Sequence, residues 1–322
     1  VEGPNSGDPL AGTPGEAAGK DFLLKTMRRY GLENVRAEPF PHRAWTPVRE
    51  RLEAVSPVLR EIVCRCGGLS ASTPTEGLEA GVVFLERGDR AEFDSRKNEV
   101  KGRFVLAPYY PVARQLKTPL AAEYGAVGLI ETRSQSGGLQ PARTCAFAKV
   151  GALPVTSISR EDALYLRRLE ERKGAVRLRL TLESRVDKKD SWNVIGEIPG
   201  TGGGSEWIVT GGHYDTWHVG PGAVDNTAGI VAVLEAARGL SLHREYLKRG
   251  VRFVLFGAEE VGLVGSWAYT RRHSEELGDT VLMINNDVGG RPTGIGSAGF
   301  EELVLALGPV AGRVRVAGEN LP

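Results

Sequence analysis

The sequence lacks the features that mark several large classes of protein. No apolar run approaches 18 residues, so no membrane-spanning helix is expected. The formal net charge is only +1, and acidic side chains are interspersed with basic ones, so no nucleic acid or other polyanion is indicated as a partner. Cysteine occurs only at Cys64, Cys66 and Cys145, and this odd number argues against a full disulfide framework.

Several catalytic signatures are also missing. The sequence has no H-E-x-x-H motif, which excludes the helix-based zinc protease pattern, and no G-x-S-x-G nucleophile elbow. The glycines at 202–204 are not followed by Lys and Ser or Thr, so a P-loop is not predicted. Cys64 and Cys66 alternate in a strand-like run, where we interpret them as packed thiols, while a metal-binding role stays open.

The composition is that of a globular protein with room for two domains. The chain has 322 residues, of which 41% are hydrophobic and 25% charged. Thr13-Pro14-Gly15-Glu16 combines an N-cap, a proline and a capping-box glutamate, so it predicts a helix that ends at Gly31. From about 47 to 188, short strands alternate with turns in what reads as a separate mixed α/β module. A polar break at 187–190 then leads to a second architecture.

The last third of the chain alternates strands with helices, which indicates a twisted, mostly parallel sheet flanked by helices. We expect strands at 194–198, 207–210, 251–256 and 281–284, helices at 226–240 and 263–273, and one more helix from 300 to about 307. The strands at 207–210, 251–256 and 281–284 lead to His213, to Glu259-Glu260 and to Asp287. Ligand sites of open α/β sheets lie beyond the carboxyl ends of the strands, so these side chains should converge at one edge.

Imidazole and carboxylate groups at such an edge suit a zinc site and metal-assisted hydrolysis. Each residue also has an ordinary interpretation. Asp225 precedes a helix and could be its N-cap, Asp215 could be a turn residue, and Glu259-Glu260 could be a solvated pair. A functional Asp215 would accept the other ring N–H of His213. His218 is assigned to the surface or to the surroundings of the site, and His42, His243 and His273 are expected to be solvated.

At these residues the chain resembles the M28 family of zinc exopeptidases, in particular its carboxypeptidase Q-like branch. The matching motifs are Gly212-His213-Tyr214-Asp215, Gly222-Ala223-Val224-Asp225-Asn226, Gly257-Ala258-Glu259-Glu260 and Asn286-Asp287. The middle block resembles the protease-associated (PA) domain that is commonly inserted in this family, through Lys101 to Leu106, Gly125 to Ile130 and Leu153-Pro154-Val155. The resemblance implies a peptidase domain in 1–46 and 189–322 and a PA-like domain in 47–188.

The resemblance also implies a two-zinc active site. His213 and Asp287 would bind one zinc ion, Glu260 would bind the second, and Asp225 would bridge them. Glu259 would be the general base acting on a water molecule shared by the two ions, and Asp215 would orient His213. The family has a further zinc-binding histidine near the end of its catalytic domain, but no histidine follows His273 here. We therefore expect a C-terminally truncated chain with an incomplete second zinc site.

The expected function is hydrolysis of terminal peptide bonds, and an aminopeptidase is the favoured type of enzyme. A dipeptidase or carboxypeptidase of the same family is the alternative among enzymes, and a catalytically inactive receptor or scaffold is the alternative from another class. Peptides are the expected substrates, and a homodimer is an open possibility. The resemblance favours a secreted or extracytoplasmic protein, although a cytoplasmic location stays open.

Overall fold

The computed structural model describes residues 10–140, 143–287, 302, 315–316 and 319–320. The expected helix at 300–307 falls almost wholly outside the described residues. Helices are α1 (Pro14–Arg29), α2 (Arg90–Ser95), α3 (Lys97–Val100), α4 (Arg114–Glu123), α5 (Arg160–Lys173), α6 (Ala228–Leu242) and α7 (Val264–Arg272). Three short helical turns flank them: η1 (Ala223–Thr227) precedes α6, η2 (Arg244–Tyr246) follows α6, and η3 (Leu277–Asp279) follows α7. The helix predicted from Thr13 is confirmed as α1: Thr13 Oγ1 accepts the Glu16 N–H at 3.2 Å.

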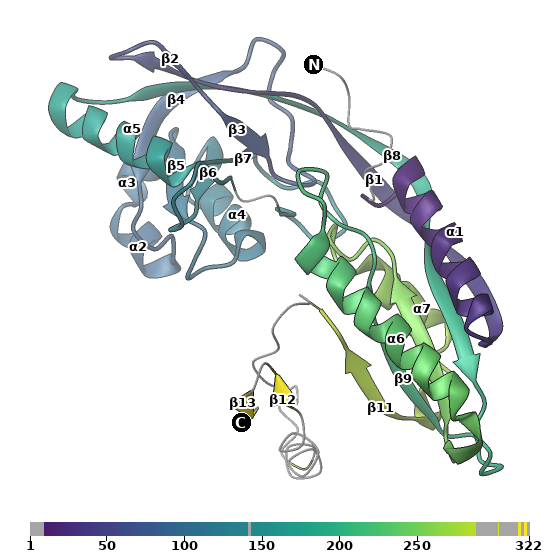
Figure 1. The fold of residues 1–322 in the computed structure, drawn as a ribbon. Helices are drawn as coiled ribbons and strands as arrows, with labels where there is room; N and C mark the ends of the chain where they lie inside the picture. Colours follow the sequence, from purple (N-terminus) through teal and green to yellow (C-terminus); the bar gives the residue numbers. More distant parts are fainter. Residues whose placement is uncertain (1–9, 141–142, 288–301, 303–314, 317–318, 321–322) are drawn as a thin grey trace.

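The strands form one mixed sheet that runs the length of the molecule (Figure 1). They are β1 (Glu33–Ser56), β2 (Arg60–Ile62), β3 (Cys64–Cys66), β4 (Leu78–Phe84), β5 (Phe104–Pro108), β6 (Gly128–Thr132), β7 (Val155–Ile158), β8 (Arg177–Ile198), β9 (Trp207–His213), β10 (Gly250–Phe256) and β11 (Thr280–Asn285). The strand order is β11-β9-β10-β8-β4-β5-β6-β7-β3, so the sheet includes strands from the middle of the chain as well as from its last third. A separate two-stranded sheet pairs β12 (Arg315–Val316) with β13 (Glu319–Asn320). The mixed α/β fold agrees with the prediction.

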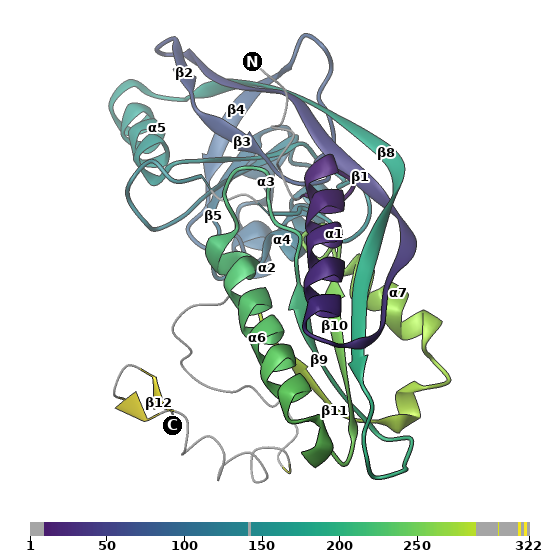
Figure 2. The ribbon, with the colours of Figure 1, turned by 45° about the vertical axis from the view of Figure 1, so that its right-hand side comes forward.

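The last third of the chain builds the layer that holds the candidate site. Strands β9, β10 and β11 are parallel, and β10 also pairs antiparallel with β8. Side chains of β10 alternate between the two faces. Val251, Phe253 and Leu255 pack with α1 and α6, while Val254 and Phe256 pack with Tyr269 of α7 on the other face. Helices therefore cover both faces, with α1 and α6 together on one of them (Figure 2).

The polar segment at 187–190 does not interrupt the sheet, so the predicted break there is wrong. Strand β8 runs through it and pairs with β1 from Arg177 to Glu197, including Asp190 opposite Pro41. Pairing with β1 satisfies the backbone groups of this stretch although the side chains at 188–190 are exposed, so hydropathy did not reveal that the strand continues. The boundaries at 46/47 and 188/189 both fall inside the ribbon of β1 and β8. The division into domains stays a prediction.

The segment of the chain between β1 and β8 forms a second α/β unit. Strands β4, β5, β6 and β7 are parallel, β3 is antiparallel to β7, and α2, α3, α4 and α5 connect or flank them. Cys64, Cys66 and Cys145 are free and buried, and burial raises their pKa values. The interpretation of Cys64 and Cys66 as packed thiols is confirmed. We call residues 60–176 the module.

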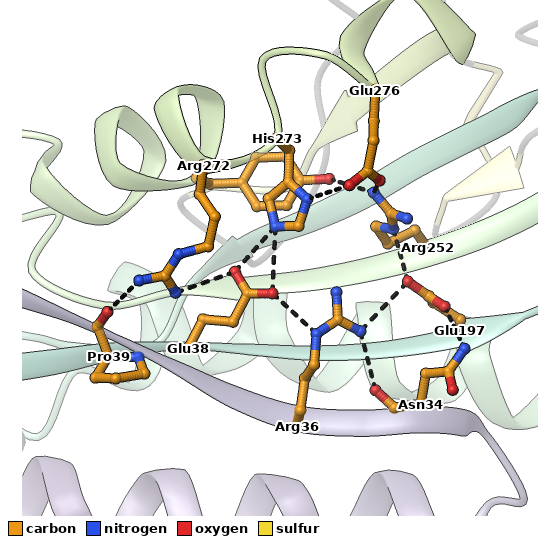
Figure 3. A network of polar contacts seen from close by, with 10 residues as sticks. Asn34, Arg36, Glu38, Pro39, Glu197, Arg252, Arg272, His273 and Glu276 are labelled. Carbon is orange, nitrogen blue, oxygen red and sulfur yellow. Dashed lines mark hydrogen bonds and ion pairs between the residues drawn. The ribbon is translucent and has the colours of Figure 1, made fainter.

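Two histidines expected at the surface are buried, and that expectation is wrong for them. His42 and His273 are each 6% exposed, whereas His243 is exposed as predicted. Figure 3 shows His273 between two carboxylates from different elements: its Nε2 lies 2.9 Å from Glu38, and its Nδ1 lies 3.1 Å from Glu276. The polar neighbours of His273 in the sequence gave no sign of Glu38, which is 235 residues away.

This network should stabilise the fold in a pH-dependent way. Burial acts to raise the pKa of Glu38, but hydrogen bonds from His273 and Arg36 outweigh it and lower the pKa below its ordinary value. Glu38→Gln removes that charge, so we expect a loss of about 1–3 kcal/mol in the free energy of unfolding near neutral pH. A lowered carboxyl pKa stabilises the fold above its unfolded pKa of about 4.3, and the gain is lost as the pH falls through the folded value.

Chemical denaturation at several pH values measures the effect. The difference between the native protein and Glu38→Gln should shrink below about pH 4. Glu183→Gln makes the same change at an exposed position of β8 and serves as the control. A difference that does not depend on pH would contradict the assigned role of the Glu38 charge.

Candidate metal centre

The predicted convergence at the edge of the sheet is confirmed. His213 is the last residue of β9 and lies opposite Phe256, the last residue of β10. Glu259 and Glu260 follow β10 in the next turn, and Asp287 lies two residues beyond β11. The parallel arrangement of the three strands therefore brings these side chains to one side of the sheet.

His213 lies at the centre of a group of carboxylates. Its Nε2 is 3.0 Å from Asp225 Oδ1, 3.2 Å from Asp287 Oδ1 and 3.9 Å from Glu259 Oε2. The imidazole is 2% exposed, whereas the side chains of Asp225 and Asp287 are 42% and 38% exposed. Nε2 of the buried ring thus faces carboxylates that are partly exposed to solvent.

The other ring nitrogen of His213 is held by Asp215, but chiefly through the main chain. Nδ1 lies 2.9 Å from the carbonyl oxygen of Asp215 and 3.5 Å from its carboxylate. A carbonyl accepts only, so Nδ1 carries the hydrogen in this contact, and Nε2 is the nitrogen that would bind a metal ion once the ring is neutral. That is the tautomer that a metal ligand needs.

The carboxylate of Asp215 fixes the acidic turn after β10, a role that the sequence did not reveal. Its two oxygens accept the backbone N–H groups of Glu259 at 3.0 Å and Glu260 at 3.2 Å. Asp215 is fully buried. Because it holds His213 on one side and both glutamates on the other, it sets the distance between the two parts of the site.

Asp225 is not an N-cap. Helix α6 begins at Ala228 with Thr227 at its N-cap, while Asp225 lies in the preceding turn with φ −112° and ψ 94°. Thr216 Oγ1 donates to the Asp225 carbonyl at 2.9 Å. This turn therefore leaves the Asp225 carboxylate available to His213.

Asn226 is a positioning residue that the sequence reasoning missed. Its side-chain amide donates to the carbonyl oxygens of His213 at 3.2 Å and Asn286 at 2.9 Å. It therefore joins the end of β9 to the end of β11. A β-carbon at Gly212 would lie 2.9 Å from the Asn226 amide, so this approach requires glycine.

The concentration of negative charge shifts the pKa values of His213, Glu259 and Glu260. Burial acts to lower the pKa of His213, but hydrogen bonds to Asp215, Asp225 and Asp287 raise it far above its ordinary value. Burial and the neighbouring acids raise the pKa of Glu259 to about 7 and that of Glu260 to about 9, although His213 partly opposes both shifts. A divalent cation would relieve this repulsion between carboxylates.

The donor atoms fit such an ion. Ligand atoms of His213, Asp225 and Asp287 all lie within 4.8 Å of one another, and the same holds for His213, Glu259 and Glu260. One imidazole nitrogen with carboxylate oxygens is a donor set that zinc accepts, and in catalytic zinc sites a position stays open for water or substrate. The first group matches the predicted ligands of one ion, while Glu260 is grouped with Glu259 rather than with Asp225.

A cavity of about 350 Å³ adjoins the cluster. His213, Glu259 and Asp287 line its polar end, and Val209, Phe256 and Met283 are among its apolar walls. Ligand cavities of this size hold one small group beside a few oriented polar atoms. His218 does not join the cluster, as expected; it packs against Trp45 at a ring distance of 5.5 Å.

Comparison with known proteins gives matches to peptidases. Residues 193–297 match the family model described as Peptidase family M28. Carboxypeptidase Q of Pongo abelii is 29% identical over 317 residues, covering 92% of this chain and 65% of that protein. The probable lipoprotein aminopeptidase LpqL of Mycobacterium tuberculosis is 29% identical over 292 residues, covering 88% of this chain and 55% of its own length.

Solved structures of peptidases also match this chain. A peptidase M28 precursor from Shewanella amazonensis superposes with a TM-score of 0.79 at 25% identity, covering 94% of this chain and 73% of that one. BSAP, a zinc aminopeptidase from Bacillus subtilis, gives a TM-score of 0.67 at 26% identity, covering 87% and 64%. The fold of this chain is thus shared with a zinc aminopeptidase. No helix in the described part of the chain is long and apolar enough to cross a membrane.

Proposed function

We propose that the protein is a zinc-dependent exopeptidase and, more specifically, an aminopeptidase. The match of residues 193–297 to the model of peptidase family M28 supports this proposal. The observation that carries this proposal is the placement of His213 Nε2 at 3.0 Å from Asp225 and 3.2 Å from Asp287. Three separate elements supply these groups, beside a cavity that can receive a substrate. The names of the relatives, which include a zinc aminopeptidase, support the choice of metal and of reaction.

His213, Asp225 and Asp287 would hold one zinc ion, and Glu260 would contribute to a second, with Asp225 between them. When bound, zinc supplies positive charge that polarises a carbonyl group and makes water more acidic. Among the residues that the structure describes, Glu260 and Asp225 would be the ligands of the second ion. A water molecule or substrate atom would complete its coordination.

Glu259 would act as general base and then as general acid. Its carboxylate is 27% exposed and lies near His213 without belonging to the closest group of ligands, so it stays free to accept a proton from the attacking water. The same carboxyl group would return that proton to the leaving amine. Asp215 would keep Glu259 and Glu260 in place through their backbone N–H groups. The apolar walls of the cavity favour an uncharged side chain at the end of the substrate.

Peptides blocked at one end test the direction of cleavage. The zinc-loaded protein should release the first residue of a peptide with an N-terminal leucine, and it should still do so when the C-terminus is an amide. Acetylation of the N-terminus should abolish cleavage, as followed by mass spectrometry. Cleavage that requires a free C-terminus would instead identify a carboxypeptidase, an alternative that the similarity to carboxypeptidase Q supports. No cleavage of any of these peptides would favour the receptor or scaffold alternative.

The compartment is a further part of the proposal. The name of the M. tuberculosis relative includes the word lipoprotein, which favours a location outside the cytoplasm. A homodimer remains a prediction from the family resemblance alone.

A further inference from the structure

Two loops beside the predicted zinc ligands touch the module: one lies between His213 and Asp225, and the other follows Glu259. The first loop, residues 214–222, follows His213 and leads to Asp225. It carries Trp217, which is 7% exposed and belongs to the same apolar cluster as Cys66 and Leu69 of the module. The indole ring lies directly against Gly68, where a β-carbon would overlap it. Gly68 therefore forms a socket that only a residue without a side chain permits.

The floor of this socket is anchored in the interior of the module. The Gly68 N–H donates to the Arg143 carbonyl at 2.9 Å, and the Cys145 N–H donates to the Gly68 carbonyl at 2.8 Å. The Arg114 guanidinium donates to the same Arg143 carbonyl at 2.5 Å and pairs with the Glu131 carboxylate.

Arg114 and Glu131 are fully buried, together with Lys117, which also pairs with Glu131. Removing one partner of a buried ion pair is costly, because the remaining charge is left without compensation. The position of Gly68, and with it the position of Trp217, is therefore fixed by the core of the module.

The loop that carries Trp217 also contacts Asp225, a predicted zinc ligand. Thr216 precedes Trp217 and donates its hydroxyl hydrogen to the Asp225 carbonyl at 2.9 Å. A β-carbon at Gly222 would lie 2.6 Å from Thr216 Oγ1, so the loop closes tightly around this hydroxyl. A shift of Trp217 would therefore move Thr216 and the backbone of Asp225.

A second, independent contact holds the turn that carries the two glutamates. The N–H of Ala148, in the module, donates to the Val261 carbonyl at 3.0 Å. Gly262 follows at φ +126°, and a β-carbon there would lie 2.6 Å from the Ala148 nitrogen. The Gly262 N–H closes the same turn onto the Glu259 carbonyl at 2.8 Å. The module thus braces the turn from outside while Asp215 holds it from inside.

We propose that the module is a positioning element of the metal site, acting through the Gly68–Trp217 socket on Asp225 and through Ala148 on the turn after Glu259. The proposal deepens the proposed function, on which its consequences for zinc rest. Asp225 and the glutamates come from loops, and a zinc site needs its ligands held at fixed distances. In this protein, part of that support comes from residues 60–176 rather than from the sheet that carries His213.

Gly68→Ala tests the proposal, with Gly81→Ala as the matched control in the same module. The new methyl group overlaps Trp217 in the first variant, whereas in the second its nearest neighbours lie 3.8 Å away. We expect zinc affinity, measured by competition with a chelating dye, to fall at least about tenfold in Gly68→Ala. It should stay close to the native value in Gly81→Ala.

Hydrogen exchange of the metal-free variants provides a readout that needs neither zinc nor hydrolysis. The Thr227 N–H donates to the Gly222 carbonyl at 2.9 Å, so exchange at this amide reports on the loop that holds Asp225. It should become faster in Gly68→Ala and not in Gly81→Ala. Trp217→Phe, which leaves the socket partly empty, carries the same test if Gly68→Ala does not fold.

The outcomes separate the inference from the proposed function. Faster exchange in Gly68→Ala together with native zinc affinity would overturn the positioning role, because the loop would have loosened without effect on the site. Native exchange and native affinity in a folded variant would overturn it as well. Faster exchange and weaker zinc binding would support it, even if the protein hydrolysed no peptide and the proposed function failed.

Discussion

Replacement of Glu259 by glutamine should reduce peptide hydrolysis by about 10²–10⁴-fold, the usual contribution of a general base. Glutamine has almost the same shape, and the Glu259 backbone N–H that binds Asp215 is unchanged. The amide cannot accept the proton of the attacking water, so the loss should appear in kcat more than in KM. Zinc content should stay at the native value, because His213, Asp225 and Asp287 are intact.

Steady-state kinetics and elemental analysis of the same preparation measure the two quantities. Glu275→Gln makes an identical change at an exposed position near the end of α7 and should leave both unchanged. A Glu259→Gln variant that keeps more than a tenth of the native rate would remove Glu259 from the role of general base. A variant that loses zinc together with activity would instead assign Glu259 as a metal ligand.

Replacement of Asp225 by asparagine should weaken zinc binding by more than about 100-fold. Residues that only support metal ligands cost 10–100-fold when they are changed, and a ligand between two ions should cost more. Asp225 Oδ1 lies 3.0 Å from His213 Nε2, so its charge faces the centre of the cluster. Asparagine keeps the size and the backbone contact with Thr216 but offers only a neutral oxygen.

Titration of zinc into the metal-free variant measures this loss directly. If Asp225 lies between two ions, the affinity for both should fall together. Asp21→Asn, at a largely exposed site in α1, controls for the loss of one negative charge from the protein. Unchanged binding in Asp225→Asn would leave Asp225 with a purely structural role in the turn before α6.

Much of this site could be predicted because its residues directly follow the carboxyl ends of apolar strands. An apolar run followed by a polar group, repeated at His213, Glu259 and Asp287, predicts convergence once the strands are parallel. The local signal was weaker at Asp225, where an aspartate before a helix is usually a cap. Only the backbone of the turn, with Thr227 at the cap position, separates the two interpretations.

Other features depend on contacts between distant parts of the chain and could not be predicted. The carboxylate of Asp215 binds the N–H groups of residues 44 and 45 positions further on. His273 is buried by Glu38, 235 residues away, although its sequence neighbours are polar. The ribbon of β1 and β8 escaped because both strands are partly solvated and neither shows a continuous apolar face. Sequence patterns report local propensity and burial, and pairing across such distances leaves no trace in them.

The contact between the module and the metal site could not be predicted from the sequence either. Trp217 and Gly68 are ordinary residues in the sequence, and Trp217 lies beside a motif whose chemistry draws attention away from packing. Their importance follows only from the overlap that a side chain at Gly68 would cause. Glycine at such a position is required by the approach of another residue and not by its own backbone angles.

Titration of zinc into the metal-free protein, with peptide hydrolysis followed in the same samples, shows whether the cluster around His213 is a catalytic zinc site. We expect that hydrolysis is absent without zinc and rises as the site fills, and that a folded His213→Asn variant neither binds zinc tightly nor becomes active. Hydrolysis that persists in the metal-free protein, or tight zinc binding that survives the loss of His213, would contradict the assignment of a catalytic zinc site to this cluster.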